Sequence, residues 1–232
     1  MPASTATAAL GARTVGDIAA STPGATAVFR RFRIDFCCHG DLDLAAAAAR
    51  RGVDPAALEQ ALEELAAPAA DMPAAMDSAA LIDHIRSSYH EAHRQQLPEL
   101  IALSRKVEAV HRDHPKVPAG LAEALRRIAA DLEAHMAKEE ASLFPAMLDA
   151  GEGEGGLGLS IAALRADHDG HGQMVELVEA MTGRFAPPAD ACRSWQALYV
   201  GAARFVDDLM EHIHLENNVL FPRFAAPGQA SA

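Results

Sequence analysis

The chain contains few of the residues that build β-sheets or disulfide scaffolds. Only 5% of its 232 residues are aromatic, and Val, Ile and Thr are sparse beside a large excess of alanine. Its three cysteines are too few for a disulfide framework, which agrees with a reducing compartment. Half of the residues are nevertheless hydrophobic, so the chain can bury a core, and alanine favours helix over sheet. The composition therefore predicts an all-α protein.

The chain also lacks an excess of positive charge and long apolar runs. Its formal net charge of −12 would repel a phosphate backbone, so nucleic acid is not an expected partner. No stretch reaches the roughly 18 apolar residues of a membrane-spanning helix. The opening segment has no basic region followed by an apolar core. We therefore expect a cytoplasmic protein with no membrane partner.

Proline, glycine and small residues divide the chain into segments. Short amphipathic pieces run through the first 66 residues, and one of them starts with an N-cap aspartate and a first-turn proline at Asp54 and Pro55. A stretch rich in Pro and Ala without an apolar stripe then indicates a linker. The expected order is a small helical domain, a linker, a helical bundle and a tail, at residues 1–66, 67–78, 79–224 and 225–232.

The bundle region contains four long amphipathic stretches. The segments between them are short and rich in Pro or Gly, which makes neighbouring helices antiparallel. The expected helices span about 78–111, 119–148, 158–183 and 190–222. The sequence therefore predicts an antiparallel four-helix bundle preceded by a small domain of short helices.

The bundle region repeats itself. HMAKEEASLFP (135–145) and HIHLENNVLFP (212–222) share the pattern His-x3-Glu-x3-Leu-Phe-Pro. YHEAH (89–93) and DHDGH (167–171) share an aligned His-x2-His. The first and second histidines of the two copies are separated by 45 and 44 residues. The bundle is therefore expected to contain two copies of one helical hairpin, related by an approximate twofold axis.

This repeat predicts a pair of metal ions. Residues four apart share a helix face, so each hairpin offers one His from its first helix and a His with a Glu from its second. A single His-x3-Glu is more often a solvated pair, but two matched copies converging on a bundle interior need a cation to offset the burial of their charges. Nitrogen and oxygen ligands without thiolate suit Fe or Mn. The predicted ligands are His90, His135, Glu139, His168, His212 and Glu216.

Other polar residues near these positions have several interpretations. His93 and His171 lie three residues after predicted ligands and could be hydrogen-bond donors behind them or additional ligands. Asp131 lies four residues before His135 and could orient its imidazole. The remaining bundle histidines are expected away from the ligand face, the last two of them exposed in a loop: His84, His214, His111 and His114.

Cys37 and Cys38 are adjacent and precede a His-Gly pair. Adjacent cysteines form a disulfide only through a strained ring. Three alternatives stay open: a buried cysteine beside an incidental one, an exposed dithiol that carries or hands over iron, or a redox-active pair. Arg30, Arg31 and Arg33 are close in sequence and could lower a thiol pKa.

With these residues identified, the sequence resembles the repair-of-iron-centres family of di-iron proteins. The resemblance rests on Asp-Phe-Cys-Cys-His-Gly (35–40), Tyr-His-Glu-Ala-His-Arg-Gln-Gln-Leu-Pro-Glu-Leu (89–100), His-Met-Ala-Lys-Glu-Glu (135–140) and His-Leu-Glu-Asn-Asn-Val-Leu-Phe-Pro (214–222). It implies a hemerythrin-like bundle with two non-haem iron ions. Glu139 and Glu216 would bridge them, together with an oxo or hydroxo group. His39 departs from the family, which often has glycine there.

The resemblance also implies a function. The family restores iron-sulfur clusters damaged by nitric oxide or peroxide, so the expected activity is iron donation to apo or damaged iron-sulfur proteins, with Cys37 and Cys38 assisting transfer. Binding or reduction of nitric oxide at a ferrous pair is a related activity, and a homodimer is compatible with it. The alternatives are reversible dioxygen binding as in hemerythrin, iron storage or sensing, and a scaffold that the metal only stabilises.

Overall fold

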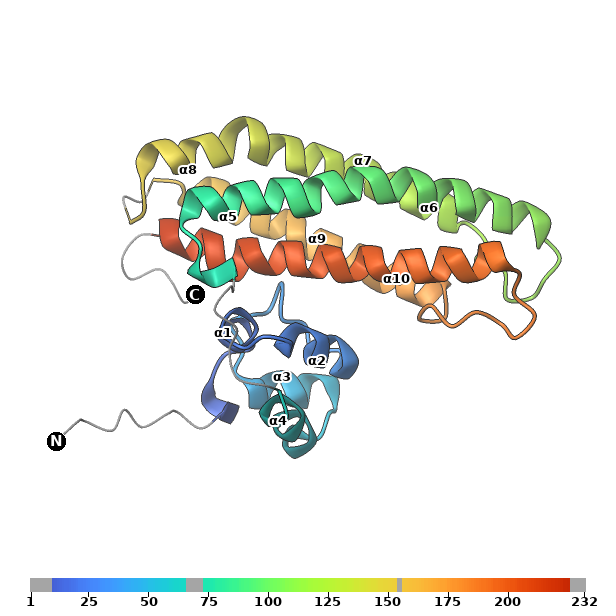
Figure 1. The fold of residues 1–232 in the computed structure, drawn as a ribbon, viewed down its shortest axis with the longest axis horizontal. Coiled ribbons are helices and arrows are strands. Elements are labelled where there is room, and N and C mark those ends of the chain that lie inside the picture. Colours follow the sequence, from blue (N-terminus) through green and yellow to red (C-terminus); the bar gives the residue numbers. More distant parts are fainter. Residues whose placement is uncertain (1–9, 66–72, 154–155, 226–232) are drawn as a thin grey trace.

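The computed structural model describes residues 10–65, 73–153 and 156–225, and within these ranges it is helical with no strand. The small helices at the amino-terminal end lie beneath a long bundle (Figure 1). The predicted all-α class and the four-helix bundle are confirmed. The first half of the expected linker (67–72) and all but the first residue of the expected tail (226–232) lie outside the described ranges.

Four short helices form the amino-terminal unit. Three of them begin at a Thr or Asp whose side chain accepts a hydrogen bond from a backbone N–H of the first turn, at Thr14, Asp43 and Asp54. Such caps stabilise helices too short to persist alone. A 3-10 turn, η1 (Leu10–Ala12), precedes the helices α1 (Val15–Ser21), α2 (Ala25–Phe32), α3 (Leu44–Arg51) and α4 (Pro55–Glu63).

The bundle consists of four long helical rods, three of which change from α to π geometry along their length. A 3-10 turn, η2 (Pro73–Ala75), leads into it. The first rod joins α5 (Ser78–Ile85), η3 (Arg86–His90) and α6 (Glu91–Val110), and the second joins α7 (Leu121–Lys138), η4 (Glu139–Leu143) and α8 (Phe144–Ala150). The third is α9 (Gly158–Met181), and the fourth joins α10 (Arg193–His214), η5 (Leu215–Leu220) and η6 (Phe221–Phe224).

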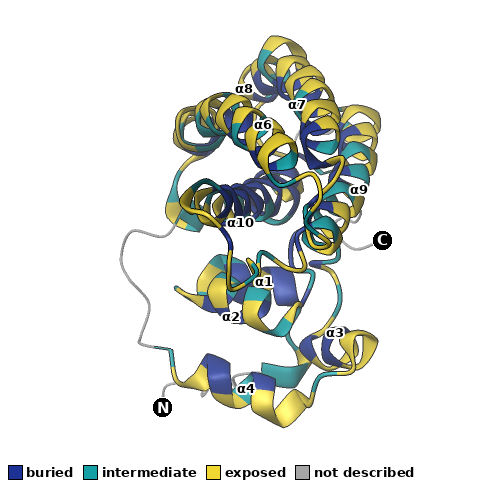
Figure 2. Cartoon of the chain, turned by 90° about the vertical axis from the view of Figure 1, so that its right-hand side faces the viewer, coloured by how far each residue is buried: buried dark blue, intermediate teal, exposed yellow. Residues whose placement is uncertain are grey.

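The rods turn their apolar faces toward one another, and the buried residues line the inside of the bundle (Figure 2). One apolar cluster continues from the bundle into the amino-terminal unit through Phe29, Phe36 and Phe205. A second cluster, which includes Leu81, Phe144 and Phe221, fills the end of the bundle where α5 and α8 lie. Two apolar regions therefore exclude water from the middle of the rods.

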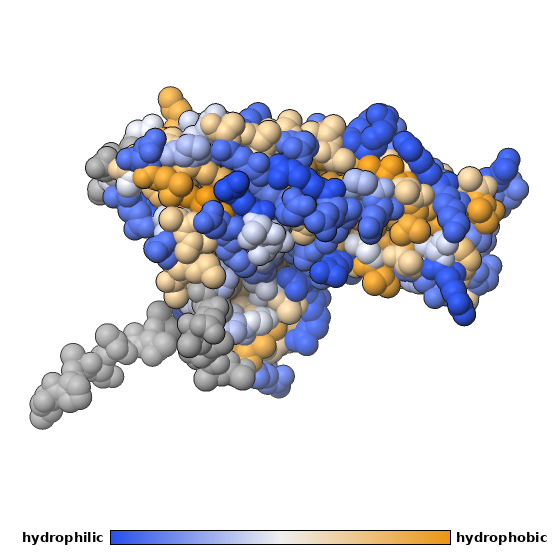
Figure 3. Space-filling model, turned by 45° about the horizontal axis from the view of Figure 1, so that its top comes forward, coloured by the Kyte–Doolittle hydropathy of each residue, from blue (hydrophilic) through white to orange (hydrophobic). Residues whose placement is uncertain are grey.

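The outer surface is mainly polar. The face in Figure 3 is largely hydrophilic, with apolar patches separated from one another. Among the described residues, the exposed large apolar side chains are Val110, Leu148, Leu159, Leu177 and Val200. None of the described helices is long and apolar enough to cross a membrane.

Close backbone contacts fix the amino-terminal unit against the fourth rod. Asn218 of η5 donates from its Nδ2 to the carbonyl oxygen of Phe36, at 3.0 Å. A Cβ atom added to Gly40 would lie 2.1 Å from the Oδ1 atom of Asn218. Gly16 donates its backbone N–H to the carbonyl of Gly40, at 2.9 Å. The loop 36–40 thus fits against η5 only because no side chain stands at position 40.

We expect Gly40→Ala to lower the free energy of unfolding by about 1–3 kcal/mol, because the added methyl overpacks this contact. Urea unfolding at neutral pH measures the change. Gly158→Ala is the matched control, since a Cβ there meets nothing within 4 Å, and its stability should be unchanged or slightly higher. Equal unfolding midpoints for both variants would contradict the close fit.

His214 makes this junction sensitive to pH. Its ring lies edge-on to Phe36, with centroids 5.5 Å apart, and its Nδ1 is 3.0 Å from Asn218 Nδ2. Burial lowers the pKa of His214 to about 4. Because the unfolded chain takes up this proton near pH 6.5, stability should fall as the pH drops from about 6.5 toward 4.

This pH dependence can be measured as the free energy of unfolding in urea between pH 7 and pH 4.5. The variant His214→Gln has no titratable imidazole and should show a smaller decrease over the same interval. A decrease equal to that of the wild-type protein would exclude His214 as a contributor.

Candidate metal centre

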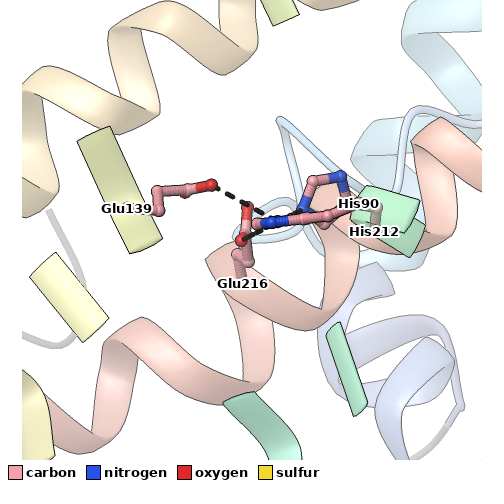
Figure 4. A group of neighbouring side chains, drawn as sticks. All are labelled: His90, Glu139, His212 and Glu216. Carbon is pink, nitrogen blue, oxygen red and sulfur yellow. Dashed lines mark hydrogen bonds and ion pairs between the residues drawn. The ribbon is translucent and has the colours of Figure 1, made fainter. Parts of the chain in front are cut away.

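The six residues that the sequence repeat singled out come together inside the bundle. They form two groups that share both glutamates, and every member is buried. The first group is His90, His212, Glu139 and Glu216, and the second is His135, His168, Glu139 and Glu216. Figure 4 shows the side chains of the first group, with Glu139 pointing toward the other three from the opposite side of the site.

We call His90 and His212 the first histidine pair. Their Nε2 atoms lie 3.0 Å apart. The Nε2 of His212 is 3.1 Å from Glu216 Oε1, and the Nε2 of His90 is 3.6 Å from Glu139 Oε2. Two imidazole nitrogens and one oxygen from each carboxylate thus surround one position.

We call His135 and His168 the second histidine pair. Their Nε2 atoms lie 2.9 Å apart. The Nε2 of His135 is 3.2 Å from Glu139 Oε1, and the Nε2 of His168 is 3.1 Å from Glu216 Oε2. Each carboxylate therefore directs one oxygen to the first histidine pair and the other oxygen to the second. Each pair also takes one histidine from each helical hairpin.

Without a cation this arrangement is electrostatically unfavourable. His90, His135 and His168 direct their Nδ1 atoms to side-chain oxygens, so an imidazole that donates through Nδ1 presents a lone pair at Nε2. In the second histidine pair, two neutral rings of this tautomer would place two lone pairs about 3 Å apart, where they repel each other. Neither oxygen of Glu139 has a hydrogen-bond donor among the described residues. Orphaned buried carboxylate oxygens beside converging imidazoles fit the donor set of a metal centre.

The pKa values of the two glutamates also reflect the unfavourable electrostatics of the metal-free site. Burial raises the pKa of Glu139, and the charge of Glu216 raises it further. Burial opposes ionisation of Glu216 as well, but His212 and His168 outweigh it and hold its pKa well below the usual range. Bound cations would remove the competition between the two carboxylates.

The pKa values of the imidazoles also differ from one another. Burial lowers the pKa of His90 to about 4, and His212 adds to the effect. Burial acts in the same direction on His135, but its contacts with Glu139 outweigh it and raise the pKa to about 9. The metal-free site therefore favours a proton at His135, where Glu139 lies opposite the ring.

Three π-helical turns lie at the predicted ligands. His90 ends η3, Glu139 begins η4, and Glu216 lies in η5. Such turns are rare and concentrate at functional sites. The turns η4 and η5 come just before the Phe-Pro pairs at 144–145 and 221–222, where proline removes an N–H from the helical ladder and lowers the cost of a change in register. Helical periodicity does not predict these turns, although the shared Leu-Phe-Pro follows two of them.

Side chains behind the imidazoles fix three of the four rings. The Nδ1 of His90 lies 2.7 Å from Glu140 Oε1. The Nδ1 of His135 lies 3.4 Å from Asp167 Oδ2. Asp131 was predicted for this second role, but it is exposed on the outside of α7. The predicted orienting carboxylate was therefore wrong, and Asp167 on α9 takes its place.

The third ring is held by an amide. The Nδ1 of His168 lies 2.9 Å from Asn217 Oδ1, and Asn217 donates its Nδ2 to the carbonyl oxygen of Cys37, at 3.0 Å. The fourth ring is different, because the Nδ1 of His212 has no hydrogen-bond partner within the described ranges. The two histidine pairs are therefore supported unequally.

His93 and His171 lie behind the predicted ligands of the opposite hairpin. The ring of His93 is 5.4 Å from that of His212, and the ring of His171 is 4.9 Å from that of His135. Neither belongs to the two ligand groups. Burial lowers the pKa of His93 to about 2 and that of His171 to about 3, so both stay neutral.

The remaining bundle histidines lie away from the ligands, as predicted. His214 faces the amino-terminal unit, and His84 lies edge-on to Tyr89. His111 and His114 were expected to be exposed, which is wrong. Both are half-buried against Trp195, with ring centroids 5.0 and 5.1 Å away.

We expect Glu140→Ala to weaken metal binding about 10–100-fold, because His90 loses the acceptor that orients its ring. Glu133→Ala is the matched control. Arg94 binds both Glu133 and Glu140, so the control breaks a contact of the same arginine without touching a predicted ligand. Competition with a chelator of known affinity measures the effect, and equal affinity of the two variants would exclude a role for Glu140 in orienting His90.

The cysteine pair, Cys37 and Cys38, lies against the second histidine pair. Both are free thiols, Cys37 buried and Cys38 half-buried. Cys38 Sγ is 3.5 Å from the carbonyl oxygen of His168. The predicted lowering of thiol pKa by nearby arginines was wrong for Cys37, because its hydrogen bond with Cys38 and its burial raise that pKa. Arg30 instead pairs with Asp207, at 2.9 Å.

The fold and the arrangement of donors define a hemerythrin-like cation-binding bundle. In agreement, the profile of the hemerythrin HHE cation binding domain matches residues 80–224. A second profile, described as a domain of unknown function (DUF542), matches residues 11–66. The two matches cover the bundle and the unit that carries the cysteine pair.

Similar proteins share both parts. An iron-sulfur cluster repair protein YtfE from Musicola paradisiaca is 47% identical over 220 residues, which cover 94% of this chain and 98% of the relative. Proteins of the same name from Citrobacter koseri and Escherichia coli are 45% and 44% identical, with 91% of this chain and 96% of each relative covered. The chain belongs to this family of iron-sulfur cluster repair proteins, in which a hemerythrin HHE domain follows a DUF542 domain.

Proposed function

We propose that this protein holds two non-haem iron ions in the bundle and donates iron to apo or damaged iron-sulfur proteins. The observation that supports the proposal most strongly is the division of the two glutamates between the two histidine pairs. Each carboxylate offers one oxygen to each pair, as bridging ligands do. The names of the relatives supply the biological process, repair of iron-sulfur clusters.

In this proposal His90 and His212 would hold one ion and His135 and His168 the other, with Glu139 and Glu216 serving both. Iron held there would supply reversible ferrous and ferric chemistry and would be able to bind nitric oxide or dioxygen. The residues around the metal centre orient its ligands and keep water out. Glu140, Asp167 and Asn217 orient the rings, and the two apolar clusters exclude water.

The four predicted imidazole ligands are supported unequally, which suits release of only part of the bound iron. His212 has no partner for its Nδ1 in the described part of the chain, whereas both rings of the second histidine pair have one. A ligand whose ring is not held by an outer hydrogen bond binds metal more weakly. The imidazole of His212 is therefore the least firmly oriented of the four predicted imidazole ligands.

The test combines the iron-loaded, reduced protein with an apo iron-sulfur protein and sulfide, and follows the cluster by its absorbance. The wild-type protein should restore the cluster even with an excess of a ferrous chelator in solution, because transfer occurs between proteins. Glu216→Gln should bind less iron and restore less cluster. If the chelator completely abolishes restoration of the cluster, the protein only releases iron into solution and the proposal fails.

A second variant addresses the cysteine pair. Replacing both Cys37 and Cys38 with Ala should slow restoration while leaving the iron content within about twofold, because neither thiol belongs to the two ligand groups. Cys192→Ala is the control, since Cys192 is exposed and contacts His111 instead. Equal restoration rates for the double variant and the wild-type protein would remove the cysteine pair from the mechanism.

A further inference from the structure

The loop that carries the cysteine pair contains a third group of metal-binding atoms. A carboxylate oxygen of Asp35 and the two Sγ atoms of Cys37 and Cys38 all lie within 4.8 Å of one another. This group is separate from the six residues of the dimetal centre. It lies on a loop of the amino-terminal unit, on the other side of the His168 backbone.

The distances within this group fit one tetrahedral cation. Metal–sulfur and metal–oxygen bonds of about 2.3 and 2.1 Å place two sulfurs about 3.8 Å apart and a sulfur and an oxygen about 3.6 Å apart. The observed Sγ–Sγ distance is 3.7 Å, and Cys37 Sγ lies 3.4 Å from Asp35 Oδ1. A disulfide would need about 2.0 Å between the sulfurs. The thiols are thus spaced for chelation and not for a bond to each other.

The carboxylate is oriented and charged before any cation arrives. Asp35 Oδ1 accepts the backbone N–H of Cys38 at 3.0 Å, and Asp35 Oδ2 lies 2.7 Å from His39 Nδ1. Burial opposes its ionisation, but the Cys38 N–H and His39 outweigh burial and lower the pKa of Asp35. His39, the residue that departs from the family pattern, therefore supports the carboxylate in the way that outer hydrogen bonds support metal ligands.

A cleft gives access to the group. Its volume is about 810 Å³, and Asp35, Cys37, Cys38 and His39 line it together with Gly172 of α9. A Cβ added at Gly172 would lie 3.6 Å from Cys38 Sγ, so the glycine leaves the thiol uncovered on that side. A hydrated cation can therefore reach the sulfur atoms from solution.

We propose that Asp35, Cys37 and Cys38 form a mononuclear site for a divalent first-row cation, with ferrous iron as its occupant in the working protein. Two thiolates and one carboxylate bind the cation and leave its fourth position open, which is the pattern of sites that exchange a ligand. Binding forms two metal–sulfur bonds and one metal–oxygen bond, and the two thiol protons pass to water, so the oxidation state of the metal does not change.

This site deepens the proposed function and rests on it for the identity of the occupant. Cys38 contacts the backbone of His168, and Asn217 joins the His168 ring to the Cys37 carbonyl. The site therefore adjoins the second histidine pair on one side and the cleft on the other. Iron that leaves the dimetal centre would be held here before an acceptor takes it.

The test uses Co²⁺ as the probe, added without oxygen to the full chain after its dimetal centre has been loaded with iron. Cobalt bound by thiolate gives a sulfur-to-metal charge-transfer band that histidine and carboxylate ligands cannot produce. We expect one equivalent of this band per chain with unchanged iron content. Cys37→Ser and Cys38→Ser should each abolish it, and Asp35→Asn should weaken cobalt binding at least about 10-fold.

Cys192→Ser is the matched control, because Cys192 also lies beside an imidazole, with Sγ 3.1 Å from His111 Nε2. Its band should equal that of the wild-type protein. The site is refuted if the band persists in Cys37→Ser and Cys38→Ser, if it disappears in Cys192→Ser, or if Asp35→Asn binds cobalt as tightly as the wild-type protein. Circular dichroism establishes that each variant is folded before the titration.

The cobalt titration tests the thiolate site and the cluster restoration assay tests the proposed function, so their outcomes are independent. Restoration without a thiolate band would refute this site and support iron donation from the dimetal centre alone. A thiolate band without restoration would support the site and refute the proposed function, leaving the cation bound there without a cluster to receive it.

Discussion

Two buried glutamates facing four imidazoles are the constraint on which the rest of the molecule depends. In a low-dielectric interior, each unpaired charge costs on the order of several kcal/mol. The carboxylate oxygens of Glu139 lack donors among the described residues, and the Nε2 atoms of each histidine pair approach to about 3 Å. The apolar clusters that enclose the site make this cost larger, so the same packing that stabilises the bundle also favours binding of a cation at the site.

The surrounding structure adapts to this constraint. The π turns shift the register of three rods where ligands are needed, and carboxylates or amides from neighbouring rods fix the rings. The amino-terminal unit takes part through Asn217, which connects a ring of the bundle to the backbone of the cysteine pair. The ring of His168 and the backbone of Cys37 thus share one amide side chain.

The sequence predicted the helices and the six converging residues because both depend on local spacing. Positions four apart share a helix face whatever lies around them, and the repeat supplied the second copy. The residues behind the rings were not predictable in this way. Asp167 and Asn217 come from rods other than those of the rings they hold, so their places depend on the register between helices. Nearness in sequence was also a poor guide at Arg30, because this side chain pairs with Asp207 and not with the thiols.

Both hairpins contribute residues to each histidine pair, and this arrangement bears on the ancestry of the fold. Each histidine pair combines one residue from the first hairpin with one from the second, and each glutamate serves both pairs. A solitary hairpin would hold only half of either position. Two identical hairpins associating about a twofold axis would complete both at once, so a homodimer of a chain half this length would offer the same six donors.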